Sequence, residues 1–381
     1  MADKKRMDTL QEEVEVDPKK KQRIINSTRP EWNFGTCCGL WFLLPLDIMA
    51  DILSRLPAKS VAKLRCVCKR WLSLTHDPLL LKWHQERSSS YVVVGKRLRH
   101  GEIYKYSNIG DGENSKEIYC KVKLGRVYYQ LSNFVDGLTC AYGFTGKSDL
   151  YLLNPMTREL QKLGKNSRRR EYFKYENFGL GVDLTMGLCK IVRLCTCSDD
   201  RRVVQCEVYN VVTMQWRFLG EAPFELFNHS NSVFFRGALH WIGCLPGDGY
   251  QDQGIPSIYR FNIKDEKFEP PISLPCPPSP DMHLCPDFGL KELKGKFWLF
   301  YLSFDRTYCE IWTMKDYLNS AWVKEYKFHS NNLLSLLEVC CKEIVDNDIL
   351  FRPYQCESFA FYKESLISPE KLSKASRRRK K

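Results

Sequence analysis

The 381-residue chain predicts a small all-α unit followed by an all-β domain, a β-propeller of about six blades. Apolar residues recur at helical spacing between residues 43 and 84, as they do on one face of an amphipathic helix. From residue 91 onward, short β-rich runs are separated by Gly, Asn, Asp and Pro, which is typical of strands and turns. Similar hairpins then return every 50 to 58 residues, a period typical of propeller repeats.

The N-terminal segment, residues 1–40, alternates basic and acidic clusters with few apolar side chains, and we expect it to be disordered. It lacks the apolar core of a signal peptide, and its apolar runs are too short to span a bilayer. We therefore expect no membrane association and a location in the nucleus, the cytoplasm or both. Residues 19–23 (KKKQR) resemble a short nuclear localisation signal, although such clusters also arise by chance.

The helical unit begins at Pro45, which suits a first helical turn because that position needs no N–H donor. Asp47 places a carboxylate near the positive end of the helix dipole. The apolar stripe of this helix consists of Ile48, Ile52, Leu53 and Leu56, and Pro57 ends it. A second stripe consists of Val61, Leu64, Val67, Trp71 and Leu74, before Asp77-Pro78. Short helices bury little surface alone, so this unit needs another body to cover it, either the rest of the chain or a partner.

These residues, in order and spacing, resemble the F-box of plant F-box proteins. The matching motifs are Leu44-Pro45-x-Asp47-Ile48, residues 52–57 with Lys59-Ser60, residues 65–69 with Trp71, and Asp77-Pro78. The resemblance implies a docking surface for the small adaptor subunit of an SCF-type ubiquitin ligase, and through it for the cullin. By that match the adaptor contacts are Leu44, Pro45, Ile48, Leu53, Val67 and Cys68. The core of the unit is assigned to Ile52, Leu56, Leu64 and Trp71.

Two kinds of hairpin alternate along the β domain. In the first kind, an apolar strand leads through an Asn or Asp turn into a second strand. These turns stand at Asn154, Asn210, Asn262 and Asp316, which are 56, 52 and 54 residues apart. The turns of the second kind lie at Asp136-Gly137, Gly187, Gly237, Gly295 and residues 346–348.

Two hairpins per repeat make a four-stranded sheet, which cannot cover both of its own faces. Blades packed around an axis bury these faces on their neighbours. The candidate tryptophans for this core are Trp216, Trp241, Trp298, Trp312 and Trp322. Five turns of the repeat plus residues 91–131 predict about six blades, and residues 359–362 are a candidate to pair with the first strands. A pair of twisted β-sandwiches is the structural alternative.

Residues 91–362 also resemble the kelch-like F-box-associated domain that follows the F-box in a large plant family. The motifs that carry this likeness are Gly137-Leu138, residues 154–159, 190–193 and 207–209, Trp216-Arg217, and residues 237–241 and 310–315. The chain then divides into a disordered segment (1–40), an F-box (41–88), a propeller-like domain (91–362) and a basic disordered tail (363–381).

The net charge is +13, and residues 363–381 alone carry eight Lys or Arg against two Glu. Such a tail suits contact with nucleic acid or nuclear import, and a solvated tail explains it equally well. The 17 cysteines contain no C-x-x-C pair, so we interpret them as reduced thiols and expect no metal site.

No motif predicts catalysis. Residues 141–148 satisfy a permissive phosphate-loop pattern, but a strand pattern follows where a helix is needed. Gly179-x-Gly181 lacks the third glycine of a dinucleotide loop. His240 lies in an apolar run and is interpreted as a core residue. We therefore expect no catalytic residue and no cofactor.

The favoured function is a non-catalytic, substrate-recognition subunit of an SCF-type E3 ubiquitin ligase, whose β domain binds a target protein for ubiquitination and proteasomal degradation. The alternative is a basic propeller protein that associates with nucleic acid or acts as a scaffold without a ligase role. A propeller enzyme is the third possibility, and it would need a metal constellation that the sequence lacks. The target stays unspecified, and residues 243–255 and 270–286 are candidate loops for it.

Overall fold

A computed structural model describes residues 44–88, 90–94, 102–107, 115–121, 129–143, 149–164, 173–197, 203–226, 232–245, 256–275, 287–293, 295–303, 307–329 and 359–372. The predicted disordered segment 1–40, the hairpin turn at 346–348 and residues 373–381 of the predicted disordered tail lie outside these ranges. Residues 363–372 of that tail are described and include the buried Ser365 and Leu366, so this part differs from the prediction of disorder.

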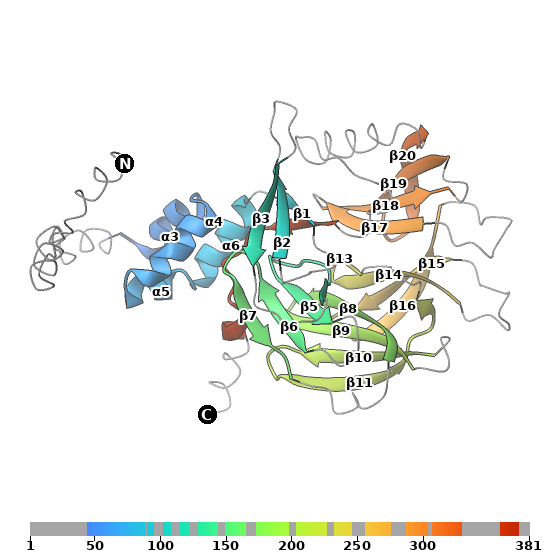
Figure 1. Cartoon of the computed structure of the whole chain (residues 1–381), viewed down its shortest axis with the longest axis horizontal. Helices are drawn as coiled ribbons and strands as arrows, with labels where there is room; N and C mark the ends of the chain where they lie inside the picture. The colour runs from blue at the N-terminus through green and yellow to red at the C-terminus, as the bar shows by residue number, and fades with distance from the viewer. Residues whose placement is uncertain are drawn as a thin grey trace, which may run out of the picture. The chain divides into compact units, whose positions relative to one another are not determined.

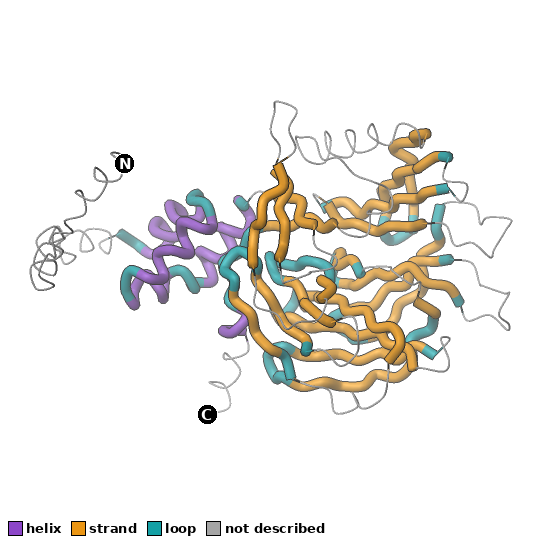
Figure 2. Tube along the Cα trace, viewed as in Figure 1, coloured by secondary structure: helices purple, strands orange, loops and turns teal. Residues whose placement is uncertain are grey.

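The helical unit is made of short helices (Figures 1 and 2). They are α3 (Leu46–Ser54), α4 (Ala58–Lys63), the 3₁₀ helix η1 (Leu64–Cys66), α5 (Lys69–Leu74) and α6 (Pro78–Arg87). Cys68 has an extended backbone and divides the second predicted stripe between η1 and α5. Asp77 caps α6, because its Oδ1 accepts hydrogen bonds from the N–H groups of Leu79 and Leu80. Within the described ranges, none of these helices has the length and apolar character that a membrane crossing requires.

The described strands form five antiparallel sheets, which we number as blades 1 to 5 (Figure 2). Blade 1 has the order β21 (Phe359–Lys363), β1 (Ser90–Val94), β2 (Glu102–Ser107) and β3 (Ser115–Lys121). Blade 2 consists of β4 (Tyr129–Leu131), β5 (Thr139–Gly143), β6 (Leu150–Asn154) and β7 (Glu159–Lys162). Blade 3 consists of β8 (Phe173–Asp183), β9 (Leu188–Cys197), β10 (Val204–Asn210) and β11 (Gln215–Glu221).

The two remaining blades complete the set. Blade 4 consists of β12 (Glu225–Leu226), β13 (Val233–Phe235), β14 (Ala238–Cys244), β15 (Ser257–Asn262) and β16 (Lys267–Ser273). Both β12 and β13 pair with β14. Blade 5 consists of β17 (Asp287–Leu293), β18 (Lys296–Leu302), β19 (Tyr308–Asp316) and β20 (Ala321–His329).

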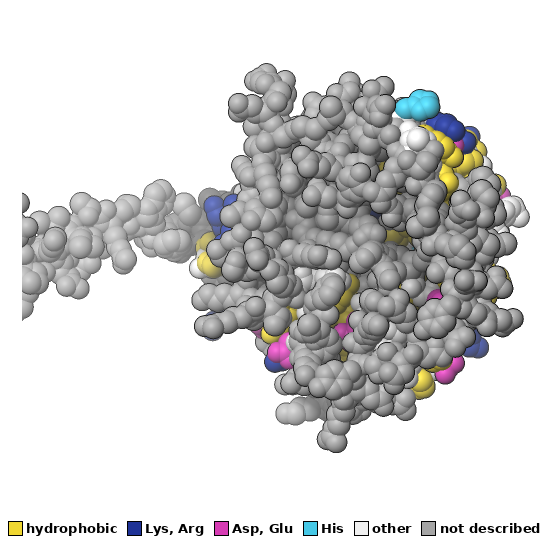
Figure 3. Space-filling model, turned by 45° about the vertical axis from the view of Figure 1, so that its right-hand side comes forward, with side chains coloured by type: hydrophobic (Ala, Val, Ile, Leu, Met, Phe, Trp, Pro, Cys, Tyr) yellow, Lys and Arg dark blue, Asp and Glu magenta, His cyan; other side chains and the backbone are white. Residues whose placement is uncertain are grey.

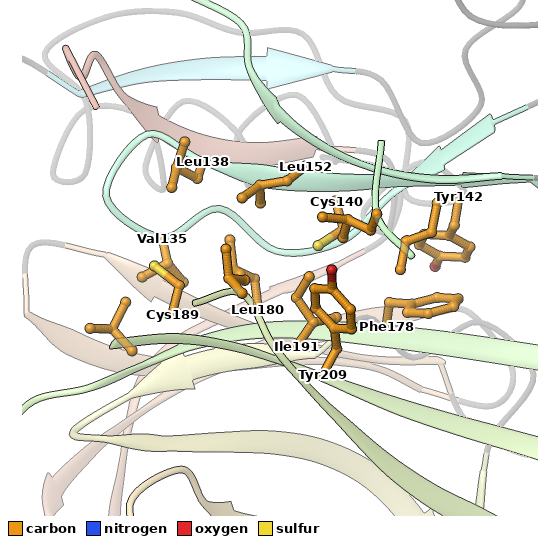
Figure 4. Packing of buried hydrophobic residues seen from close by; sticks show 14 residues of the cluster. Val135, Leu138, Cys140, Tyr142, Leu152, Phe178, Leu180, Cys189, Ile191 and Tyr209 are labelled. Atoms are coloured by element: carbon orange, nitrogen blue, oxygen red, sulfur yellow. The ribbon is translucent and has the colours of Figure 1, made fainter. Parts of the chain in front are cut away.

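Apolar side chains join each blade to the next. Figure 4 shows the core between blades 2 and 3, where Leu152 and Cys140 of one sheet face Leu180 and Ile191 of the other. A second cluster joins blades 3 and 4, and a third joins blades 4 and 5. Strand β17 of blade 5 contacts β21 of blade 1, and Tyr362 of β21 packs in the core of blade 2. The described blades therefore close into a ring, as a propeller requires.

The prediction that residues 359–362 pair with the first strands is confirmed. Strand β21 runs antiparallel to β1, from the pair Ser90–Lys363 to the pair Val94–Phe359. The prediction of about six blades differs from the five blades found in the described residues. The additional blade was predicted from the hairpin turn at residues 346–348, which lies outside the described residues.

Five hairpin turns are stabilised by the same local hydrogen bonds to an Asn or Asp side chain. The side-chain oxygen Oδ1 accepts hydrogen bonds from backbone N–H groups two and three residues later at Asn154, Asn210, Asn262, Asp316 and also Asp183. The residue four positions later has positive φ in every case, from 53° at Glu266 and Ser320 to 63° at Gly187. Asn and Asp favour such turns because their short polar side chains replace a backbone acceptor. The second kind of hairpin is seen at Asp136-Gly137, with φ values of 50° and 74°.

The candidate tryptophans lie mostly where blades meet. Trp241 is buried in the core between blades 3 and 4, and Trp216 packs against the core between blades 2 and 3. Trp312 and Trp322 pack against the core between blades 4 and 5. Trp298 is also buried.

Candidate functional site

The predicted docking residues lie on or beside the helical unit. Leu44, Pro45 and Ile48 are exposed at the start of α3, and Ile48 has 45% of its surface accessible. Val67 is equally exposed, and the Cys68 thiol beside it is also exposed. Five of the six predicted adaptor contacts are therefore accessible to a partner, while contact with an adaptor stays a prediction.

Leu53 is the exception, because it lies on the buried face of helix α3. The Leu53 side chain is 2% exposed and lies on the same helical face as the buried Met49 and Ala50. Leu56, predicted as core, is 41% exposed and follows Ile48 and the half-buried Ile52 at four-residue steps. The buried face of α3 is therefore rotated by one residue from the predicted stripe. We correct the assignments accordingly: Leu53 belongs to the core, and Leu56 is exposed in the turn after α3.

The remaining core assignments differ in degree. Trp71 is buried, as is Leu74 one turn later, whereas Leu64 is half-buried. The buried His84 joins α6 to the turn after α3, because its Nε2 donates a hydrogen bond to the carbonyl oxygen of Leu56 at 3.1 Å. Burial lowers the pKa of His84, so the ring is neutral and Nε2 carries its proton for this bond.

Ion pairs hold the ends of the helical unit together. Asp51 of α3 pairs with Arg55 one turn later at 2.9 Å and with Arg87 of α6 at 2.7 Å. The hydrogen bond from Arg87, followed by that from Arg55, holds the pKa of Asp51 below its usual value of 3.8. The carboxylate is therefore charged at neutral pH and joins the second half of α3 to the end of α6.

The helical unit is tied to the β domain through Arg65, a contact that the sequence does not predict. Its Nη1 lies 2.7 Å from Glu159 Oε1 of blade 2, and its Nη2 donates to the carbonyl oxygen of Leu366. Lys363 Nζ also donates to the carbonyl oxygen of Glu86 at the end of α6, at 3.2 Å. Arg65 and Glu159 both occur in the quoted motifs, but they stand 94 residues apart and nothing local links them.

Comparison with known proteins identifies both parts of the chain. The F-box domain family matches residues 41–83. The family described as F-box associated beta propeller domain matches residues 102–365, more than half of the chain. The chain belongs to the F-box associated beta propeller family. Its helical unit carries an F-box, and the described blades belong to the propeller domain of that family.

Curated relatives come from Arabidopsis thaliana. An F-box/kelch-repeat protein is 28% identical over 241 residues, which cover 59% of this chain and 59% of the relative. An F-box protein is 24% identical over 323 residues, covering 78% and 81%. The chain thus spans about three fifths of the first relative's length. A solved structure titled Dos1 propeller has a TM-score of 0.32 and 9% identity, and covers 56% of this chain and 52% of its own.

The β domain contains a buried histidine rather than a reactive one. His240 is fully buried, its Nδ1 lies 3.2 Å from the carbonyl oxygen of Val233, and its Nε2 lies 2.7 Å from Tyr317 Oη. The carbonyl can only accept, so Nδ1 donates to Val233 and Tyr317 donates to Nε2. Within the described ranges, no group of three or more His, Cys, Asp or Glu side chains is placed to bind a metal ion.

We expect His240 to make the domain sensitive to acid. Burial, with the nearby charge of Arg260 as a smaller cause, lowers the pKa of His240 from 6.5 to about 3. Between these values the unfolded chain binds a proton that the folded chain does not, so stability falls as pH falls through this window. In melting experiments across this pH range, His240→Gln should lose less stability on acidification than the wild type. His329→Gln, at an exposed position, should follow the wild type. A His240→Gln curve parallel to the wild-type curve would contradict this assignment.

Proposed function

We propose that this F-box protein is the substrate-recognition subunit of an SCF-type E3 ubiquitin ligase. The F-box docks the adaptor subunit and, through it, the cullin, while the propeller binds a target protein. The observation that carries the proposal is the exposure of apolar side chains on α3 and on the turn that follows it, where Ile48 and Leu56 are each more than 40% accessible in a unit that matches the F-box family. Exposed apolar side chains gathered on one face mark an interaction site.

The junction at Arg65 supports this role. A recognition subunit accelerates ubiquitin transfer by holding the target lysine near the charged conjugating enzyme, which is catalysis by proximity. Such positioning works best when the docking unit and the recognition domain move as one body. The charge-assisted bond from Arg65 to Glu159 and the bond from Lys363 to Glu86 provide connections of this kind.

Loss of adaptor binding is the direct test. In Leu44→Ala/Pro45→Ala, two exposed side chains at the start of α3 are truncated, and we expect adaptor affinity to fall at least about thirtyfold. Affinity for a purified plant SCF adaptor measures the effect, and circular dichroism checks that the propeller stays folded. The matched control is Leu318→Ala, which truncates an exposed leucine of blade 5 and should bind the adaptor like the wild type. Unchanged binding by the double variant would refute these contacts, and a folded wild type that binds no adaptor would refute the ligase role.

A further inference from the structure

Exposed apolar and basic side chains meet on three neighbouring blades. Leu184 and Met186 lie on the β8–β9 turn of blade 3, and each is 67% exposed. Leu318, on the β19–β20 turn of blade 5, is 85% exposed. Arg236 is exposed on the β13–β14 turn of blade 4, between them in blade order. Figure 3 shows a face on whose rim hydrophobic side chains lie beside Lys and Arg side chains.

Contacts between neighbouring turns make them one continuous surface. A Cβ placed on Gly237 would lie 3.4 Å from Leu184 Cδ1, so the blade 3 turn rests on the blade 4 turn. The guanidinium carbon of Arg236 lies 5.5 Å from the ring centre of Tyr317 in blade 5. Arg260 of blade 4 lies at the same distance from that ring. The hairpin ridge is defined as Leu184, Met186, Arg236, Arg260, Tyr317 and Leu318.

The centre of the hairpin ridge is rigid. The hydroxyl of Tyr317 donates to the buried His240, and its ring packs edge-on against Phe235 with centroids 5.5 Å apart. Arg260 is held by the carbonyl oxygen of Pro270 at 3.2 Å and by Glu269 at 3.5 Å. An aromatic ring that is already immobilised costs little further entropy when a partner covers it. Tyr and Arg are also the residue types most often found at the energetic centres of interfaces.

The carboxylates beside the ridge, Asp183 and Asp316, accept hydrogen bonds from residues of their own turns. Asp183 Oδ1 accepts hydrogen bonds from the backbone and hydroxyl of Thr185 and from the Met186 N–H. Asp316 accepts two backbone N–H groups and the Asn319 side chain, and it also lies within the field of Arg236. Arg236 therefore presents a guanidinium to solvent beside apolar side chains, in a chain of net charge +13. Charge complementarity selects an anionic partner for such a surface.

We propose that the hairpin ridge binds a short acidic peptide segment of the target protein, with carboxylates that pair with Arg236 and apolar side chains that cover Leu184, Met186 and Leu318. This inference rests on the proposed function, because it names the class of target that the propeller recognises. A peptide is favoured over nucleic acid because three of the four exposed side chains of the ridge, those of Leu184, Met186 and Leu318, are apolar. Phosphate backbones instead require several solvent-facing Lys or Arg side chains.

The test starts with a random-sequence peptide library displayed on phage and selected against the full chain. Enriched peptides should combine Asp or Glu with Leu, Ile or Phe. The affinity of a synthetic enriched peptide should fall at least about tenfold in Arg236→Glu and in Leu318→Asp. The matched control is Arg158→Glu, since Arg158 is also an exposed arginine with positive φ in a hairpin turn, on blade 2. That variant should bind the peptide like the wild type.

The adaptor assay on the same samples separates the two proposals. Arg236→Glu should keep adaptor binding, and Leu44→Ala/Pro45→Ala should keep peptide binding. If the wild-type protein binds the peptide through Arg236 but does not bind the adaptor, the ligase role is refuted and the peptide site is supported. Three outcomes would refute peptide binding at the hairpin ridge. The first is that the enriched peptides lack acidic residues, and the second is that neither ridge variant changes the peptide affinity. The third is that single-stranded RNA displaces the peptide and that its binding depends on Arg236 and falls steeply with salt, as phosphate contacts do.

Discussion

Replacing Arg193 by Met is expected to destabilise the propeller by about 3–5 kcal/mol. Arg193 is on β9, and its side chain is 2% exposed. Its Nη1 lies 2.8 Å from Glu207 Oε2 on β10, directly across the strand pair, and its Nε donates to Glu176 Oε1 on β8 at 2.9 Å. Both carboxylates are almost fully buried, so losing the cation leaves two buried negative charges without a counterion. The midpoint of urea unfolding measures the loss.

The control for Arg193 separates charge from packing. In Arg193→Met/Glu176→Leu/Glu207→Leu, all three charges are replaced by apolar side chains, and most of the lost stability should return because no buried charge is left unpaired. Lys162→Met breaks an exposed pair with Asp149 and should leave the midpoint unchanged. A single Arg193 variant as stable as the wild type would show that blade 3 does not depend on this ion network.

The positions of the hairpin turns are the part of the fold that the sequence predicts best. Asn154, Asn210, Asn262 and Asp316 mark hairpins in the sequence, and each accepts the backbone hydrogen bonds expected of its residue type. Such turns are predictable because donor, acceptor and positive φ all lie within five residues. The same locality explains why the strand runs between them were found.

Features that depend on distant residues were predicted less well. The buried face of α3 is centred on Ala50 and Leu53 rather than on Ile52, and Leu56 is exposed in the turn after the helix, because packing against the rest of the fold selects which apolar side chains are covered. Counting turns along the chain predicts a fifth repeat at residues 346–348, which lie outside the described residues, whereas the described strands form five sheets. The pair of Arg65 with Glu159 likewise joins segments with no local relation.

Truncation after residue 358 is expected to abolish folding of the propeller. It removes β21, the strand that pairs with β1 and contacts β17, so the first blade loses its link to the last. It also removes Tyr362, which packs between blades 1 and 2, and the buried Leu366. An open ring exposes apolar faces and an unpaired strand edge, which favours aggregation. Size-exclusion chromatography and near-ultraviolet circular dichroism of the purified chain measure the outcome.

Truncation after residue 372 is the matched control, because it removes only the last nine residues of the chain, most of them basic, and should leave a folded monomer. A point variant tests the closure without shortening the chain. Asn154 Nδ2 donates to the carbonyl oxygens of Ser365 at 2.9 Å and Ile367 at 2.8 Å. Among the described contacts, the Asn210 side chain accepts hydrogen bonds only from N–H groups of its own turn. Asn154→Ala should therefore destabilise more than Asn210→Ala, by about 1–3 kcal/mol, because buried carbonyl groups lose their donors. Equal losses in the two variants, or a folded chain that ends at residue 358, would show that the ring closes without its C-terminal segment.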